Sequence, residues 1–214
     1  MKDTNTIIQR GDCFKLLAAC FYEPDRVLFI EENVGEKLGL LFDSLALNGA
    51  DTARQMQKVM EGLDQEKMSI DHAALFVGPF ELLAAPYGSV YIERNRRVMG
   101  ESTVSAARYY QEMDLSVDIK EPPDHIVIEL EFLYYLCSKE ASAAENGQSD
   151  DVNRFREMQA RFYHHAMKPW VGEFCAAIRA GTDNGFYVKL AECLDSFMGS
   201  CENIYSTAPP TAAR

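Results

Sequence analysis

The chain has 214 residues, of which 47% are hydrophobic and 25% charged, a composition typical of a globular protein with one sizeable core. Its formal net charge of −12 argues against nucleic acid and anionic membranes as partners, because both attract basic surfaces. The charge suits instead a partner that carries lysine or arginine.

Residues 1–10 contain no apolar segment of the kind found in signal peptides, and no apolar run in the sequence is long enough to cross a bilayer. We therefore expect a cytoplasmic protein without stable membrane insertion. The six cysteines form no Cys-x-x-Cys pair, so structural zinc is not indicated. In a reducing compartment they are most simply small buried hydrophobes.

Hydrophobic residues recur at helical spacing through the first third of the chain. The spacing predicts helices over residues 6–22, 34–47, 51–63 and 68–76, with a short helix opened by Pro24 between the first two. In the helix over 51–63, four polar residues are expected to face solvent. They are Arg54, Gln55, Gln57 and Lys58.

Residues 75–91 are predicted to be rich in turns, which Gly78-Pro79 and Pro86-Tyr87-Gly88 mark. Large apolar and aromatic side chains are unusual in such a segment. Either the segment folds over the core, or it lines a groove, since binding residues concentrate on loops that a rigid scaffold carries.

The second half continues the helical pattern. Helices are predicted over residues 101–113, 124–140, 152–167 and 186–197, with another that begins at Pro169. Residues 141–151 are predicted to form an exposed loop and residues 206–214 a disordered tail. No segment alternates as a strand would. We predict an all-α fold, a single-domain helical bundle of about nine or ten helices over residues 1–205.

Residues 121–129 are the most informative stretch. Two prolines end the preceding segment, Asp124 is placed to cap the next helix, and His125 falls in its first turn, where the dipole disfavours a protonated imidazole. Glu129 follows His125 by four residues, so both can lie on one helical face. With Glu121 these residues form either a capped helix start, a recognition site, or both.

The sequence contains no phosphate-binding loop, dinucleotide-binding glycine pattern, serine-hydrolase elbow or His-Glu-x-x-His motif. The three other histidines have no ligating neighbours and are assigned structural or surface roles. The only set that could perform chemistry is Glu121, Asp124, His125 and Glu129, and nothing else in the sequence completes it as a metal site.

Several blocks of the sequence resemble the TorD/DmsD family of redox-enzyme maturation chaperones, which is related to NarJ. Residues 121–126 are Glu-Pro-Pro-Asp-His-Ile, residues 71–79 are Asp-His-Ala-Ala-Leu-Phe-Val-Gly-Pro, and residues 86–91 are Pro-Tyr-Gly-Ser-Val-Tyr. A later helix-turn-helix carries His165, Pro169, Trp170 and Phe174. The resemblance spans residues 7–197, with His72 where the family usually has tyrosine.

The resemblance implies a chaperone without catalytic activity or cofactor. Such a chaperone binds the twin-arginine signal peptide and the apo form of a molybdopterin-dependent oxidoreductase, assists cofactor insertion and delays export. Monomers and domain-swapped dimers both occur in the family. Two alternatives stay open: a NarJ-like assembly factor that binds the mature subunit, and a small metallo-enzyme that uses Asp124, His125 and Glu129.

A twin-arginine leader presents two guanidinium groups followed by an apolar stretch, so its receptor needs an acidic mouth and an apolar groove. Carboxylates of residues 121–129 can supply the mouth, and the turn-rich segment can supply the groove. The predicted signal-peptide-binding residues are Leu75, Phe76, Pro86, Tyr87, Ser89, Tyr91, Glu121, Pro123, Asp124, His125 and Glu129.

Overall fold

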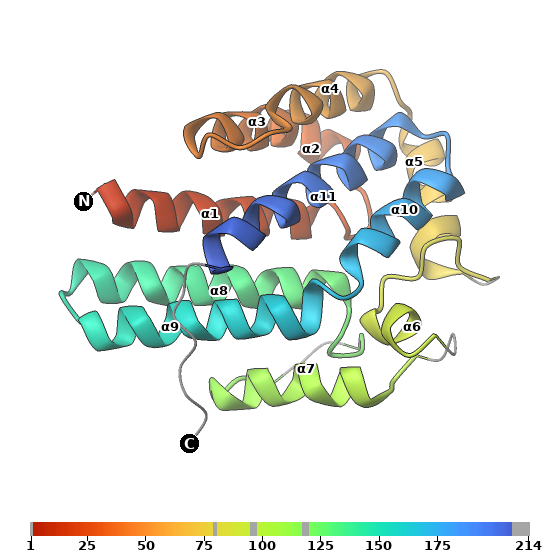
Figure 1. Ribbon diagram of the computed structural model, residues 1–214. Coiled ribbons are helices and arrows are strands. Elements are labelled where there is room, and N and C mark those ends of the chain that lie inside the picture. Colours follow the sequence, from red (N-terminus) through yellow and green to blue (C-terminus); the bar gives the residue numbers. More distant parts are fainter. Residues whose placement is uncertain (1, 79–80, 95–97, 117–119, 207–214) are drawn as a thin grey trace.

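Helices dominate the computed structural model, which describes residues 2–78, 81–94, 98–116 and 120–206 (Figure 1). Within these ranges the β-type pairing is limited to one isolated antiparallel bridge, between Tyr87 and His125. The all-α prediction is confirmed. The described residues form eleven α-helices and two π-helical segments, slightly more than predicted.

The first half of the chain contains α1 (Lys2–Ala19), α2 (Arg26–Glu31), α3 (Val34–Ser44), α4 (Ala50–Glu61), α5 (Gln65–His72), the π-helix η1 (Ala73–Val77) and α6 (Gly88–Ile92). The second half contains α7 (Glu101–Glu112), α8 (Ile126–Glu145), α9 (Ser149–Phe162), the π-helix η2 (Tyr163–Met167), α10 (Val171–Gly181) and α11 (Gly185–Ser206). No helix in the described ranges is both long enough and apolar enough to cross a membrane.

The predicted loop over residues 141–151 is wrong. Helix α8 continues to Glu145 and α9 begins at Ser149, because Ala141 and Ala143 extend the buried stripe of α8. The turn is confined to the residues around Gly147, whose φ of 70° suits glycine. At the other end, α11 continues through Ser206, and the remainder of the predicted tail lies outside the described residues.

One polar residue of α4 is also buried rather than solvent-facing. The Gln57 side chain is fully enclosed, and its Oε1 accepts a hydrogen bond from the Gly35 backbone N–H at 3.0 Å. A side chain at position 35 would collide with the α4 backbone, since an added Cβ would lie 2.6 Å from the Ala53 carbonyl oxygen. The close approach of α3 and α4 therefore depends on this glycine.

Helix α8 lies at the centre of the structure and packs lengthwise between α1 and α9 (Figure 1). Its apolar side chains are buried on most of its circumference, as the dense apolar pattern predicts. Ring–ring contacts of Phe132 with Tyr110 and Phe162 connect it to α7 and to the end of α9. Helix α8 therefore determines where α7 can lie.

A buried polar network fastens the far half of α8 to three other helices. The Glu140 carboxylate is fully buried and pairs with Arg10 of α1 at 2.7 Å and with Arg156 of α9 at 3.0 Å. Gln159 donates to Glu140 at 2.8 Å and accepts from Tyr205 of α11 at 3.2 Å. Two guanidinium groups thus compensate one buried carboxylate, which is the condition for burying such a charge.

Replacement of one of these arginines should destabilise the protein. We expect Arg10→Met to lower the free energy of unfolding by about 3 kcal/mol, the low end for a broken buried pair, because Arg156 still contacts Glu140. The matched control is Lys37→Met, which breaks an exposed pair with Glu32 and should change stability far less than Arg10→Met does. Urea unfolding measures both, and equal small losses would contradict a stabilising role for the network.

Candidate functional site

The two motif-bearing segments of the sequence meet in the structure. The backbone N–H of Ile126 donates to the Pro86 carbonyl oxygen at 2.9 Å, and that of Gly88 donates to the Asp124 carbonyl oxygen at 2.9 Å. These two bonds form the isolated bridge between Tyr87 and His125. They hold the start of α6 against the start of α8, so residues far apart in the sequence share one site.

The predicted cap of α8 is displaced by one residue. His125 is the N-cap, with an extended backbone, and its Nδ1 accepts a hydrogen bond from the Val127 N–H at 3.2 Å. Asp124 therefore does not cap α8 as predicted, and His125 is not in the first turn. Instead the Asp124 side chain turns toward α6, where its Oδ2 accepts from the Ser89 N–H at 2.7 Å.

Asp124 and Ser89 each retain an unpartnered polar atom inside the protein. Both residues are almost completely buried, yet Oδ1 of Asp124 and Oγ of Ser89 have no hydrogen-bond partner among the described residues. A buried acceptor without a donor costs free energy. The pair therefore indicates a position prepared for a donor group from outside the chain.

Glu129 lies one helical turn further along α8 and is 1% exposed. Its Oε2 accepts a hydrogen bond from Nε1 of Trp170 at 3.1 Å, and the Tyr91 ring stacks on that indole at a centroid distance of 5.7 Å. Burial raises the pKa of the Glu129 carboxyl well above its usual range, and the nearby Asp124 carboxylate raises it further. Gly88 belongs to the same arrangement, since a Cβ there would lie 3.0 Å from the indole nitrogen.

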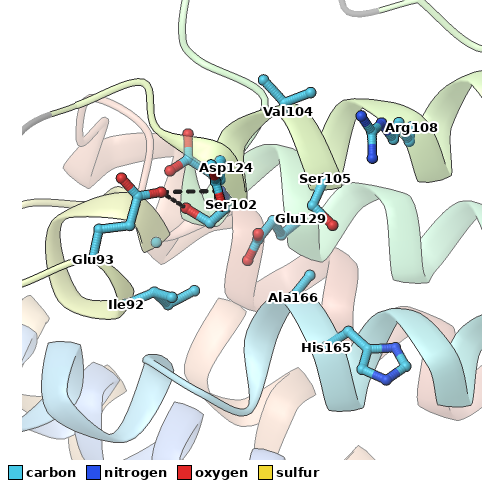
Figure 2. Close-up of a pocket in the computed structure, with 12 residues that line it drawn as sticks. Ile92, Glu93, Ser102, Val104, Ser105, Arg108, Asp124, Glu129, His165 and Ala166 are labelled. Atoms are coloured by element: carbon cyan, nitrogen blue, oxygen red, sulfur yellow. Dashed lines mark hydrogen bonds between the residues drawn. The ribbon is translucent and has the colours of Figure 1, made fainter.

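Asp124 and Glu129 open onto a cavity of about 660 Å³ between α6, α7, the start of α8 and η2 (Figure 2). We call it the acidic pocket, because among the described residues four carboxyl groups and one guanidinium line it. Its lining residues are Gly88, Ile92, Glu93, Glu101, Ser102, Val104, Ser105, Arg108, Asp124, Glu129, His165 and Ala166.

The rest of the wall positions these acids. Glu93 accepts hydrogen bonds from the backbone N–H and the hydroxyl of Ser102, at 3.0 and 2.9 Å, which joins the end of α6 to the start of α7 (Figure 2). Ile92 and Val104 lie on the rim and are 36% and 53% exposed. Figure 2 shows His165 on η2, at the opposite end from Glu93. The exposed part of the lining is mixed: Ile92 and Val104 are apolar, whereas Glu101, Ser105 and Arg108 are polar.

Other predicted site residues occupy the core. Leu75 is fully buried, Phe76 is 5% exposed, and the Phe76 ring contacts Phe21 and Phe174. Pro86 is buried as well. The structure places these residues inside the protein rather than on a groove wall. The open apolar surface beside the acids comes from α6 and α7 instead.

The remaining predicted residues form a separate outer face. Tyr87 donates its hydroxyl to Oε2 of the exposed Glu121 at 2.9 Å, and its ring meets the His125 ring edge-on at 5.3 Å. The Pro123 carbonyl oxygen accepts from the Tyr110 hydroxyl at 2.7 Å. None of these residues lines the acidic pocket. The predicted acidic cluster thus divides into an inner and an outer pair.

The outer imidazole is uncharged near neutral pH. Burial lowers the pKa of His125 to about 4, although the carboxylates of Glu121 and Asp124 oppose this shift. A neutral ring is consistent with Nδ1 acting as the acceptor for the Val127 N–H. This arrangement makes His125 a structural cap.

The predicted alternative of a metal site finds no support in this geometry. Asp124, His125 and Glu129 bind three different partners, the N–H of Ser89, the N–H of Val127 and the indole of Trp170. In the part of the chain that the structure describes, no group of three or more His, Cys, Asp or Glu residues is arranged to hold a metal ion.

Sequence reasoning missed most of the pocket wall, including Glu93 and Ser102. These residues are scattered and belong to no motif. The one available signal was on α7, where Glu101, Ser105 and Arg108 recur at helical spacing and form a polar stripe.

Comparison with known proteins gives one family match. The profile of the nitrate reductase delta subunit family matches residues 43–176, a range that contains every residue of the acidic pocket. The chain is 35% identical over 102 residues to the selenate reductase assembly chaperone protein of Thauera selenatis, which covers 46% of this chain and 51% of that protein.

Two further relatives extend this match. The chain is 24% identical to the chaperone protein TorD of Aliivibrio salmonicida, over 63% of this chain and 62% of the relative. It is 25% identical to a Haemophilus influenzae protein named "Probable Tat proofreading chaperone DmsD", over 87% of each chain. Thus the chain spans only half to two thirds of the length of the first two relatives, but most of the third.

A solved structure supports the fold. A crystal structure of an Archaeoglobus fulgidus protein, described as a candidate redox enzyme maturation protein, aligns with a TM-score of 0.55 and 22% identity, over 89% of this chain and 93% of that one. At this identity the likeness concerns the fold alone.

The cap residue makes a testable contribution to acid stability. Because the folded-state pKa of His125 lies near 4, below the unfolded value of about 6.5, its contribution is present above pH 6.5 and is lost as the pH falls toward 4. His125→Asn keeps a good cap but does not titrate. We expect wild type to lose up to about 2 kcal/mol relative to this variant across that window, measured by urea unfolding. A pH-independent difference would contradict the assignment.

Proposed function

The chain belongs to the nitrate reductase delta subunit family, and from this membership we propose that it is a maturation chaperone for a molybdopterin-dependent oxidoreductase. Its relatives are named as assembly chaperones, TorD or DmsD, and none of these names denotes a catalyst. In this proposal the chaperone captures the twin-arginine leader of its client and holds the apo form until the cofactor has been inserted.

The observation that carries the proposal is the unpartnered Oδ1 of Asp124, a residue that lines the acidic pocket. This oxygen is buried, lacks a donor, and belongs to a carboxylate whose other oxygen is already engaged by the Ser89 N–H. A guanidinium group supplies donors and a positive charge together, and charge-assisted hydrogen bonds are the strong ones. An arginine side chain therefore matches what this position lacks.

The surroundings suit the rest of a leader. Ile92 and Val104 lie on the rim and can contact the apolar residues that follow the arginines. The net charge of −12 attracts a basic segment over a longer range. In this proposal the bound leader stays covered while folding and cofactor insertion proceed. The chaperone then acts in the cytoplasm, where export begins.

A second candidate is a NarJ-like assembly factor that binds the mature part of the subunit. The family description and the names of the selenate and chlorate reductase assembly chaperones favour it. The two candidates differ in what the client must contain. Capture of a client from which the leader has been removed would favour the assembly factor, whereas dependence on the leader favours the first proposal.

Replacement of the Asp124 charge provides the direct test. Asp124→Asn keeps an oxygen for the Ser89 N–H but removes the anion, so it should weaken binding of a twin-arginine peptide about tenfold or more, the equivalent of one charge-assisted bond. Isothermal titration calorimetry with a synthetic peptide of two adjacent arginines and an apolar segment measures this.

The matched control is Glu131→Gln, which alters an exposed acid of the same helix whose oxygen accepts from Tyr22. It should bind the peptide as wild type does. If a folded Asp124→Asn variant also binds normally, the acidic pocket is not the arginine site.

A further inference from the structure

Helix α8 carries two fully buried glutamates in opposite electrostatic situations. Glu140 pairs with Arg10 at 2.7 Å and with Arg156 at 3.0 Å. Glu129 receives a hydrogen bond from the Trp170 indole at 3.1 Å and, within the described ranges, pairs with no Lys or Arg. The same fold therefore provides two guanidinium groups for one buried carboxyl and none for the other.

A buried carboxyl without a counter-charge is most stable as the neutral acid, because desolvation penalises its anion. Asp124 adds to this effect, since two neighbouring buried anions repel each other. Both influences raise the pKa of Glu129 well above its usual range. Both therefore favour the neutral form of Glu129.

The other groups around Glu129 do not replace a counter-charge. Arg108 is exposed, and Figure 2 shows it on α7 at a distance from the inner acids. The pKa of the buried Tyr110 is raised well above its usual range, so it stays neutral. Tyr110 on α7 interacts electrostatically with Glu129. The other charged or titratable groups that line the pocket with Glu129 are Asp124 before α8, Glu93 after α6, Glu101 and Arg108 on α7, and His165 on η2.

We propose that Glu129 is the proton-exchange residue of the acidic pocket: it is neutral while the pocket is empty, and it releases one proton when the guanidinium groups of a leader enter. This inference rests on the proposed function. The O–H bond of the Glu129 carboxyl breaks, the proton passes to solvent through the open pocket, and the arginines keep theirs. Two cations then compensate the two carboxylates of Asp124 and Glu129. Arginines already compensate the buried Glu140 carboxylate elsewhere on α8.

Proton release has a defined consequence for affinity. Because binding favours the deprotonated form of Glu129, the peptide binds more tightly as the pH rises, by up to about tenfold per pH unit for one proton. The neutral state of Glu129 also explains how two buried acids can lie next to each other when no ligand is bound. Only a ligand with more than one positive charge compensates both of them.

The experiment follows binding of the twin-arginine peptide to the full chain between about pH 6 and pH 8. Trp170 is the single tryptophan of the sequence and touches Glu129, so its fluorescence reports occupancy. Calorimetry in buffers of different ionisation enthalpy counts the protons. We expect the wild-type dissociation constant to fall with rising pH and one proton to be released.

Three variants identify the group that titrates. Glu129→Gln keeps an acceptor for Trp170 but has no proton to release, so the pH dependence and the proton release should disappear. His165→Gln removes the imidazole from the described lining of the same pocket and should retain both. Glu131→Gln, the exposed control, should behave as wild type.

Binding that does not vary with pH, or a pH dependence that His165→Gln removes and Glu129→Gln keeps, would overturn the inference and leave the proposed function intact. Failure of the peptide to bind at any pH would overturn both. If Glu129→Gln does not fold, proton counting on wild type and His165→Gln decides the question, since release by both supports Glu129 and release by wild type alone excludes it.

Discussion

Three hydrogen bonds between the segment that leads into α6 and the start of α8 determine the rest of the site. The backbone pair joining Pro86 to Ile126 and Gly88 to Asp124 fixes the two segments in register, and the Asp124 side chain then reaches the Ser89 N–H. This register turns Asp124 inward, away from the helix that follows it. Because α7 is joined to α6 through Glu93 and Ser102, it closes the opposite wall, and the acidic pocket lies between them.

The pocket and the core solve the same electrostatic problem in different ways. Burial of a carboxyl requires either a counter-charge or a proton. In the core, Arg10 and Arg156 supply the counter-charge for Glu140, and the resulting network joins α1, α8, α9 and α11. In the pocket wall, Glu129 accepts a hydrogen bond from the Trp170 N–H and forms no ion pair with the Lys and Arg residues that the structure describes. The charge of Glu140 is compensated without a ligand, whereas Glu129 has no counter-charge. Both situations occur on one helix because about three helical turns separate the two glutamates.

Much of the fold was predictable from local patterns, because apolar periodicity marks α1, α3, α8 and α11 directly. The loop wrongly predicted over residues 141–151 shows the limit of such patterns: small residues such as Ala141 look permissive in sequence but pack tightly in the structure. The sequence predicted the cap of α8 one residue too early, because sequence patterns do not define the start of a helix to a single residue. The residue pattern of 121–129 singled out Asp124 and Glu129 as candidates, but which acids line one pocket depends on α7 and η2, whose positions are tertiary.

The acidic pocket lies where α6 and α7 meet α8 and η2, and this position has a mechanical consequence. Helix α7 is tied to its neighbours at its edges by polar contacts, such as Tyr109 to Nδ1 of His165 at 3.0 Å and Arg161 to Glu112 at 3.2 Å. Such contacts are individually weak near the surface. The bundle beneath is held by apolar burial, which includes Ala166 of the pocket wall and Tyr110 of α7, and by the Glu140 network, whose residues lie outside the wall. A ligand that shifts these polar edge contacts would act away from the Glu140 network, while the ring contact of Tyr110 with Phe132 keeps α7 on the bundle.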